Sequence, residues 1–117
     1  MGFLTTHVLD TAQGIPAQGM HLRLYRVSEQ GKALIMETVT NADGRCDSPI
    51  LPEALFACGE YELEFCAGDY FRQQGLIQSQ PTFLNIIPLR FGIADQASHY
   101  HVPLLVSPYS YSTYRGS

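Results

Sequence analysis

Short runs in which apolar and polar residues alternate, separated by turn-forming residues, constrain the fold of this chain more than any other feature. In the clearest run, YELEFC at 61–66, the apolar side chains Tyr61, Leu63 and Phe65 take every second place. Successive residues of a strand point to opposite faces, so this run predicts a strand with one apolar face and one polar face that is directed to solvent. Other extended runs cover 4–10, 21–27, 33–40, 80–93, 99–107 and 108–116. The pattern predicts an all-β sandwich of seven or eight strands.

Two segments between the runs have a different character. NADGR at 41–45 is the strongest turn signal, because glycine after aspartate tolerates a positive φ. AGDYFRQQG at 67–75 predicts one short helix, with Asp69 near its start and Gly75 at its end. No linker or internal repeat divides the sequence, so we expect a single domain over 1–117.

The charge balance argues against two classes of partner. The chain has 7 Lys and Arg against 11 Asp and Glu, a formal net charge of −4. A negative net charge does not favour binding to nucleic acid or to an anionic membrane surface, both of which attract positively charged proteins. No apolar run in the sequence approaches the roughly 20 residues that cross a bilayer. We therefore expect neither a nucleic acid nor a membrane as partner.

The cysteines and the N-terminal residues bear on the compartment. Cys46, Cys58 and Cys66 are odd in number and lack CxxC spacing, which argues against a disulfide framework and against structural zinc. Small apolar cysteines of this kind are typical of a reducing compartment. MGFLTTHVLD has neither the basic stretch nor the long apolar stretch of a signal peptide. We expect a cytoplasmic protein, with the periplasm as the alternative if a leader has been removed.

Strand parity places several polar side chains away from the core. Near the start of the chain, His7 shares a face with Thr5. Near the end, His99 and His101 share a face, and the opposite face is entirely apolar. The expected core row on that opposite face consists of Tyr100, Val102, Leu104 and Val106. Something other than core packing must occupy the face that carries the histidines.

The C-terminal sequence SPYSYSTYRGS is unusual for a chain end, where residues ordinarily fray. It holds three tyrosines within six residues, followed by an arginine. Parity places Ser112 and Tyr114 on one face, opposite Tyr111 and Thr113. We expect these last residues to be held in place by contacts outside the core.

Five motifs spread over the chain match one known family. They are THVLD at 6–10, TNADGR at 40–45, RFGIAD at 90–95, HYHVPLLVSP at 99–108 and the terminal YSTYRGS. Together they resemble the transthyretin-like 5-hydroxyisourate hydrolases over essentially the whole chain. The ending YRGS is specific, because transthyretin itself shares the preceding SPYSYST but continues differently.

The resemblance implies a transthyretin-like (prealbumin-like) β-sandwich that assembles as a homotetramer, a dimer of dimers with active sites at the subunit interfaces. No cofactor and no metal are implied. The catalytic residues carried over by motif are His7, Arg45 and His101. The substrate-binding residues carried over are Ser112, Tyr114, Arg115, Gly116 and Ser117.

The implied reaction is the opening of the lactam ring of 5-hydroxyisourate by water, a step of urate (purine) degradation that gives 2-oxo-4-hydroxy-4-carboxy-5-ureidoimidazoline. A histidine with a pKa near its ordinary value of about 6.5 suits proton transfer at neutral pH. A guanidinium can hold a planar or anionic edge through paired N–H donors. In this hypothesis His7 or His101 activates water, the other histidine orients the water or delivers the proton, and Arg45 stabilises the oxyanion.

Other interpretations stay open from the sequence alone. A noncatalytic carrier of the transthyretin type would bind a small aromatic ligand in the central channel that the resemblance implies for the tetramer. A noncatalytic homophilic sandwich is a weaker alternative. His7, His99 and His101 could together chelate a metal, although no carboxylate or thiolate supports this. His99 is otherwise a structural residue or a support for the site, and a contact with the ligand stays open. The joint presence of His7, Arg45, His101 and the YRGS ending favours the hydrolase.

Overall fold

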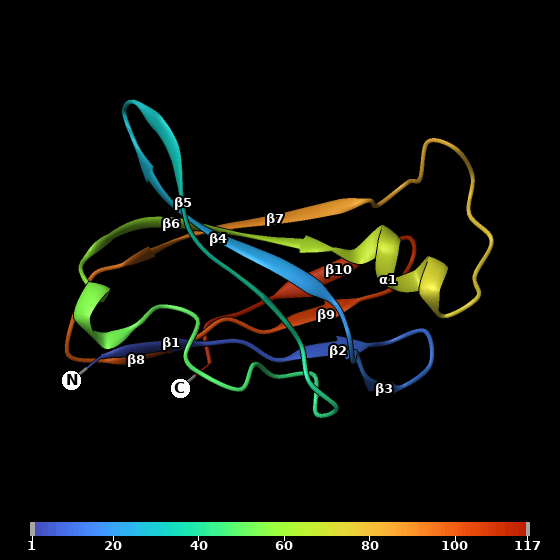
Figure 1. Ribbon diagram of the computed structural model, residues 1–117, viewed down its shortest axis with the longest axis horizontal. Coiled ribbons are helices and arrows are strands. Elements are labelled where there is room, and N and C mark those ends of the chain that lie inside the picture. Colours follow the sequence, from blue (N-terminus) through green and yellow to red (C-terminus); the bar gives the residue numbers. More distant parts are fainter. Residues whose placement is uncertain (1, 117) are drawn as a thin grey trace.

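The computed structural model of the chain describes residues 2–116 and consists mainly of strands (Figure 1). In chain order the elements are β1 (Phe3–Thr5), β2 (Val8–Asp10), β3 (Ile15–Pro16), β4 (His21–Ser28), β5 (Gly31–Val39), a 3₁₀-helix (Glu53–Leu55), β6 (Gly59–Cys66), α1 (Ala67–Gln73), β7 (Ile86–Ile93), β8 (His99–His101), β9 (Leu104–Val106) and β10 (Tyr111–Thr113).

The strands form two layers (Figure 1). One layer is an antiparallel sheet with the order β5-β4-β6-β7. The other layer holds the sheet β10-β9-β2-β3 and the two-stranded sheet β1-β8, in which the pairs β1-β8 and β2-β9 are parallel. The expected all-β sandwich with one short α-helix is confirmed. Among the residues described, no helix is both long and apolar enough to span a membrane.

The strand count differs from the expected seven or eight, because residues 2–116 contain ten strands. Thr6 and His7 separate β1 from β2, while Val102 and Pro103 separate β8 from β9. Proline has no backbone N–H and so cannot continue the ladder. The two interruptions face each other, since the Thr6 hydroxyl donates to the Val102 carbonyl (2.6 Å) and the Leu104 N–H donates to the His7 carbonyl (2.9 Å). Counted as two interrupted strands, these four pieces reduce the total to eight.

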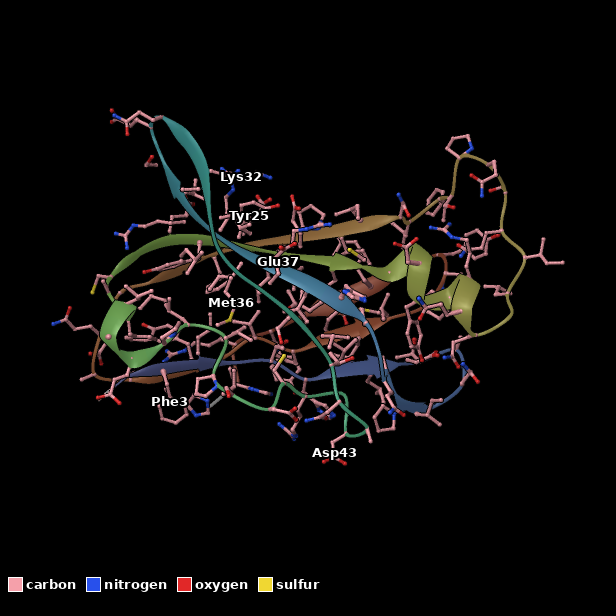
Figure 2. All side chains as sticks on the ribbon, in the orientation of Figure 1. Phe3, Tyr25, Lys32, Met36, Glu37 and Asp43 are labelled. Atoms are coloured by element: carbon pink, nitrogen blue, oxygen red, sulfur yellow. The ribbon has the colours of Figure 1, made fainter. Side chains whose placement is uncertain are left out.

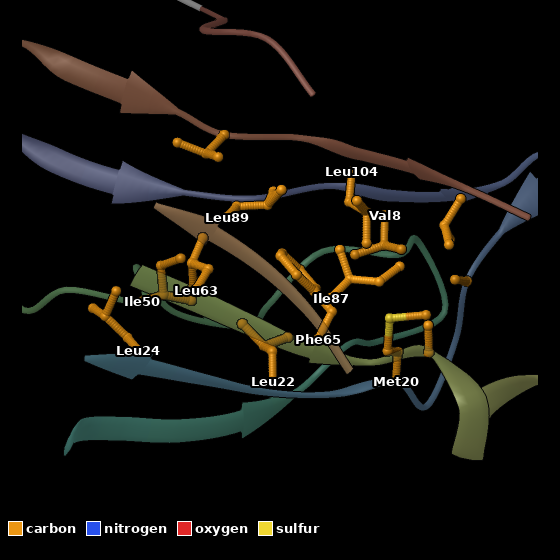
Figure 3. Packing of buried hydrophobic residues seen from close by; sticks show 14 of the residues in the cluster. Val8, Met20, Leu22, Leu24, Ile50, Leu63, Phe65, Ile87, Leu89 and Leu104 are labelled. Carbon is orange, nitrogen blue, oxygen red and sulfur yellow. The ribbon is translucent and has the colours of Figure 1, made fainter. Parts of the chain in front are cut away.

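The core fills the space between the layers (Figure 3). Val8 and Leu104 in one layer face Leu63, Phe65 and Ile87 in the other, and all five are fully buried. The apolar row expected near the C-terminus is confirmed as buried, with Tyr100, Val102, Leu104 and Val106 all in the core. Because this row faces inward, the alternate side chains of β8 point away from the core.

Two acidic side chains are buried: Glu62, on the face of β6 that the alternation predicted to be polar, and Asp10, at the end of β2. Glu62 is 5% exposed and lies under the Lys32 ammonium (2.9 Å) and the Arg90 guanidinium (3.2 Å). Burial alone would raise the pKa of Glu62, but the hydrogen bonds from Lys32 and Arg90 outweigh it and lower that pKa. Asp10 is completely buried and accepts a hydrogen bond from the Tyr70 hydroxyl (2.9 Å), which fastens α1 to β2.

Candidate active site

A hollow of about 380 Å³ opens beside the interruption between β1 and β2. It brings together residues from the first strand, from the loop that follows β5, and from β8. Its lining consists of Thr5, Thr6, Arg45, Cys46, Asp47, Ser48, Pro49, His99 and His101. Arg45 and His101, two of the three residues expected to be catalytic, therefore share one cavity.

The turn at 41–45 carries Arg45 to His7. Arg45 and His7 form an isolated antiparallel backbone bridge, and the Val8 N–H donates to the Gly44 carbonyl at 2.8 Å. The side-chain oxygen of Asn41 accepts the N–H groups of Asp43 (2.9 Å) and Arg45 (3.2 Å), so the turn is closed from within. Figure 2 shows Asp43 at the tip of the turn, directed away from both layers. The turn thus presents Arg45 to the sheet.

Gly44 is required in this turn for two reasons. Its φ is +75°, in the left-handed region where side chains bearing Cβ are strained. A Cβ at this position would also lie 2.5 Å from the carbonyl oxygen of Val8. The close backbone approach that pairs Arg45 with His7 therefore depends on glycine.

His101 is held from two sides. Its Nδ1 lies 2.8 Å from the Thr5 hydroxyl oxygen, and its carbonyl accepts the N–H of Gly116 at 2.7 Å. The ring is half-buried, which disfavours its charged form, and the positive charge of Arg45 acts in the same direction. Smaller contributions of the same sign come from His99 and His7, and together these effects lower the pKa of His101. The neutral imidazole is therefore the favoured form at neutral pH.

The Thr5 hydroxyl also contacts His99. Its oxygen lies 2.7 Å from the His99 Nε2, so that one hydroxyl bridges the two imidazoles. Phe3, which is labelled in Figure 2, lies on the same strand as Thr5. Its ring stacks on that of His99, with 4.1 Å between the ring centres. These contacts follow from the parallel register of β1 and β8, which pairs Phe3 with His99 and Thr5 with His101.

The C-terminal residues lie on another side of His101. A second hollow, of about 590 Å³, is lined by His101, Tyr114, Arg115 and Gly116. The Arg115 guanidinium lies over the Tyr100 ring, 4.1 Å from its centre, which is a cation–π contact. The tail is therefore held in place as far as Gly116, by His101 and, contrary to the expectation of contacts outside the core alone, by the core residue Tyr100.

Not every expected site residue meets the cavity in the single chain. His7 lines neither hollow, although its backbone pairs with Arg45. Ser112 lies exposed in β10 and also lines neither hollow. Ser117, expected to bind substrate, lies outside the described residues. Within 2–116, no group of three or more His, Cys, Asp or Glu side chains is placed to hold a metal.

A comparison with protein families decides the relationship. The family model described as HIUase/Transthyretin family matches residues 4–116. The chain belongs to this family. A relative named 5-hydroxyisourate hydrolase 2 from Rhizobium meliloti (strain 1021) is 60% identical over 116 residues, which cover 99% of this chain and 97% of the relative.

Solved structures of the HIUase/Transthyretin fold agree with the architecture. The crystal structure of (S)-allantoin synthase matches with a TM-score of 0.92 and 52% identity over 99% of this chain, which spans 44% of that longer chain. The structure of Klebsiella pneumoniae 5-hydroxyisourate hydrolase matches with a TM-score of 0.81 and 33% identity over 100% of both chains. The expected transthyretin-like fold is confirmed.

Three contacts of this family member escaped the sequence reasoning. Thr5 was assigned only to the face of His7, although that shared face was the available signal for its place in the site. Phe3 lies just outside the expected strand, so nothing in the pattern indicated that it stacks on His99. Tyr100 was expected in the core, where it lies, but its second contact, with Arg115, depends on how the chain end folds back.

Proposed function

We propose that this chain is a 5-hydroxyisourate hydrolase, which opens the lactam ring of 5-hydroxyisourate with water. The bond broken is N1–C6, and the product is 2-oxo-4-hydroxy-4-carboxy-5-ureidoimidazoline. The observation that carries the proposal is the convergence of a neutral imidazole, that of His101, and the Arg45 guanidinium on one cavity, while the backbone of His7 is bridged to that of Arg45. The name and the 60% identity of the Rhizobium meliloti relative support the same reaction.

We assign the general base to His101. Its Nδ1 faces the Thr5 hydroxyl, which leaves Nε2 as the ring nitrogen available to a water molecule in the cavity. Because the pKa of His101 is lowered, the ring is neutral and able to accept a proton at pH 7. Nε2 takes a proton from water as the oxygen adds to C6. General base assistance of this kind is typically worth about 10²–10⁴-fold in rate.

Arg45 and His7 serve the rest of the reaction. Addition of water to C6 turns the carbonyl oxygen into an oxyanion, and the Arg45 guanidinium, which lines the cavity, stabilises that charge. When the C6–N1 bond breaks, N1 needs a proton, and His7, paired with Arg45, delivers it. Water adds directly to C6, so no covalent enzyme intermediate is formed. The proton gained by His101 and the proton lost by His7 exchange with solvent, which restores both rings. In this scheme Tyr114, Arg115, Gly116 and Ser117 position the ring.

The test is to generate 5-hydroxyisourate in situ from urate with urate oxidase and to follow its ultraviolet decay with and without this protein. Acceleration over the spontaneous decay supports the hydrolase, and no acceleration contradicts it. Retention of an aromatic ligand without turnover would instead indicate the carrier. The carrier is not favoured, because the full-length relative at 60% identity is named a hydrolase.

We also propose that the chain assembles as a homotetramer, a dimer of dimers whose sites lie between subunits. Two edge strands support this: β7 ends one sheet and β10 ends the other, so each has backbone groups free to pair with a second copy. Tyr111 and Tyr114, on and just after β10, are exposed in the single chain, at 44% and 60%. Light scattering should give four times the chain mass of 13.0 kDa, and a fully active 13.0 kDa species would contradict the assembly.

The cytoplasm is the proposed location, because Cys46, Cys58 and Cys66 are all free thiols, as is typical of a reducing compartment. Fractionation of the source cells tests it. Recovery of the protein with the periplasmic fraction would contradict it.

A further inference from the structure

One hydroxyl lies between two histidine rings at the wall of the cavity. The Thr5 Oγ1 is 2.8 Å from the His101 Nδ1 and 2.7 Å from the His99 Nε2, and the ring centres are 6.1 Å apart. The parallel β1-β8 register places Thr5 directly beside His101. Three side chains from two strands therefore form an unbroken hydrogen-bonded chain that begins at the proposed base.

We propose that Thr5 and His99 form a proton relay behind His101, through which the positive charge created at the base moves out to His99. This inference rests on the proposed hydrolase function and names two residues that act through His101. Thr5 and His99 are thus positioning and relay residues, while His101 remains the catalytic base.

The chemistry of the hydroxyl dictates how the relay works. A threonine hydroxyl has one proton to donate and two lone pairs that accept. When both imidazoles are neutral, the hydroxyl donates to one facing nitrogen and accepts N–H from the other. In the arrangement ready for catalysis, His101 Nδ1–H donates to Thr5, Thr5 donates to His99 Nε2, and His101 Nε2 is bare.

The proton transfers then balance. The His101 Nε2 takes a proton from water, the Nδ1 proton passes to the Thr5 oxygen, and the Thr5 proton passes to the His99 Nε2. His101 ends neutral with its proton on Nε2, Thr5 is again a neutral hydroxyl, and His99 carries the positive charge. After His7 has protonated the leaving nitrogen, the relay reverses and His101 releases its Nε2 proton to solvent, which restores the starting arrangement.

The surroundings of the two rings give the relay its advantage. Arg45 lies close enough to His101 to disfavour an imidazolium there, so retaining the charge on His101 would oppose the water activation step. His99 stacks on Phe3 with its ring plane only 18° from that of the phenyl group. An aromatic face is a favourable neighbour for a cation. The charge is therefore better accommodated one step along the chain.

Matched substitutions at Thr5 test the relay kinetically. Thr5→Val keeps the shape but removes the hydroxyl, and Thr5→Ser keeps the hydroxyl. We expect Thr5→Val to lower kcat by about 10–100-fold with KM nearly unchanged, the range over which outer hydrogen-bond partners of metal-bound histidines act. Thr5→Ser should stay within about threefold of the wild type. An unchanged kcat in Thr5→Val, or an equal loss in Thr5→Ser, would overturn the proposal.

A substitution at His99 separates relay from positioning. His99→Gln can still hydrogen-bond the Thr5 hydroxyl, but its amide cannot take up a proton. We expect kcat to fall at least about tenfold while the protein keeps its unfolding temperature. A kcat equal to that of the wild type would show that the charge stays on His101 and would overturn the relay.

A measurement without substrate keeps this inference distinct from the proposed function. Nitrogen-15 NMR of the wild type, at a pH where both rings are neutral, reports the proton occupancy of His99 Nε2 and His101 Nδ1. We expect the two occupancies to add to one, and to lose this complementarity in Thr5→Val. Both nitrogens protonated, or both bare, would overturn the hydrogen-bonded chain. A wild type that fails to accelerate 5-hydroxyisourate decay would refute the proposed function, whereas the NMR result decides the chain itself.

Discussion

The backbone of Arg45 pairs with that of His7, and Gly44 makes this pairing possible. A Cβ on Gly44 would lie 2.5 Å from the Val8 carbonyl oxygen, and the φ of +75° adds strain for any other residue. Gly44→Ala should therefore push the turn off the sheet and move Arg45 away from the cavity. We expect kcat to fall at least tenfold, together with a loss of stability above the roughly 1–2 kcal/mol of left-handed strain.

Gly14→Ala is the matched control for this prediction. Gly14 has a similar φ of +71°, but no atom beyond its own chain neighbours lies within 4 Å of its Cβ position. Gly14→Ala should lose only the stability that corresponds to the strain of a left-handed backbone conformation, and its kcat should equal that of the wild type. Urea unfolding and steady-state kinetics on both variants make the comparison, and equal effects of the two substitutions would contradict the positional role of Gly44.

The two proposed catalytic histidines can be tested with a shared control. His7→Asn and His101→Asn should each slow turnover at least tenfold without loss of the assembled state, because an amide cannot transfer protons as an imidazole does. His21, exposed at the start of β4, lines neither hollow at the candidate site, and His21→Asn should leave kcat unchanged. Turnover numbers from the coupled urate oxidase assay decide, and an unaffected kcat in either of the first two variants would remove that residue from the mechanism.

Much of the fold could be predicted because local patterns reflect burial. The alternation at 61–66 predicted β6, and the pair Asp69 and Gly75 bounded a helix that the structure places at Ala67–Gln73. The interruption at Thr6 and His7 could not be predicted, because it depends on where a distant segment pairs. Burial of Glu62 was missed for the same reason, since its partners come from neighbouring strands.

The site was only partly accessible from the sequence. Parity correctly placed His101 away from the core, and motif resemblance added Arg45, whose turn position alone would indicate a solvated side chain. The bridge between the two imidazoles could not be foreseen, because it requires the register that pairs Thr5 with His101. Parity tells which face a side chain occupies, but only pairing tells what it meets there.

The pH dependence of activity should report the lowered pKa of His101. Its neutral form is the proposed base, so kcat/KM is retained above the pKa and lost as the pH falls through it. Because burial and Arg45 lower that pKa, the acid limb should lie below the ordinary value of about 6.5.

Arg45→Gln removes the part of the lowering of the His101 pKa that comes from the charge of Arg45. The acid limb of the kcat/KM profile should then move to higher pH, toward the ordinary histidine pKa. At the same time kcat should fall, because the oxyanion loses the guanidinium that stabilises it. Arg72→Gln is the control, since Arg72 pairs with Asp69 on α1 and should leave the limb in place. If the acid limb of the profile does not move in Arg45→Gln, the charge of Arg45 does not affect the pKa of His101.

The C-terminal residues should matter more for activity than for folding. The Gly116 N–H holds the His101 carbonyl at 2.7 Å, and a Cβ at Gly116 would lie 2.8 Å from the Cδ2 of His101. Gly116→Ala should therefore displace the imidazole and lower kcat, and removal of 114–117 should lower it further. The core row of β9 stays intact in both, so the unfolding temperature should change little. An equal loss of activity and stability would show that the tail is structural.

Tyr70→Phe should show the opposite behaviour, a loss of stability without loss of activity. The Tyr70 hydroxyl donates to Asp10, which is completely buried, and Gln13 supplies its other hydrogen bonds. Burial, and then Asp10, raise the pKa of Tyr70, so the hydroxyl remains a donor at neutral pH. Removing one donor from a buried carboxylate costs about 1–3 kcal/mol. Because neither Tyr70 nor Asp10 lines the hollow at Arg45 and His101, kcat should be unchanged.

The control for this prediction is Tyr109→Phe, because the Tyr109 side chain is exposed and its substitution should change stability by less than about 0.5 kcal/mol. Urea unfolding of both variants at one protein concentration measures the loss of stability. If Tyr70→Phe unfolds at the same urea concentration as Tyr109→Phe, Asp10 does not depend on the hydroxyl to stay buried.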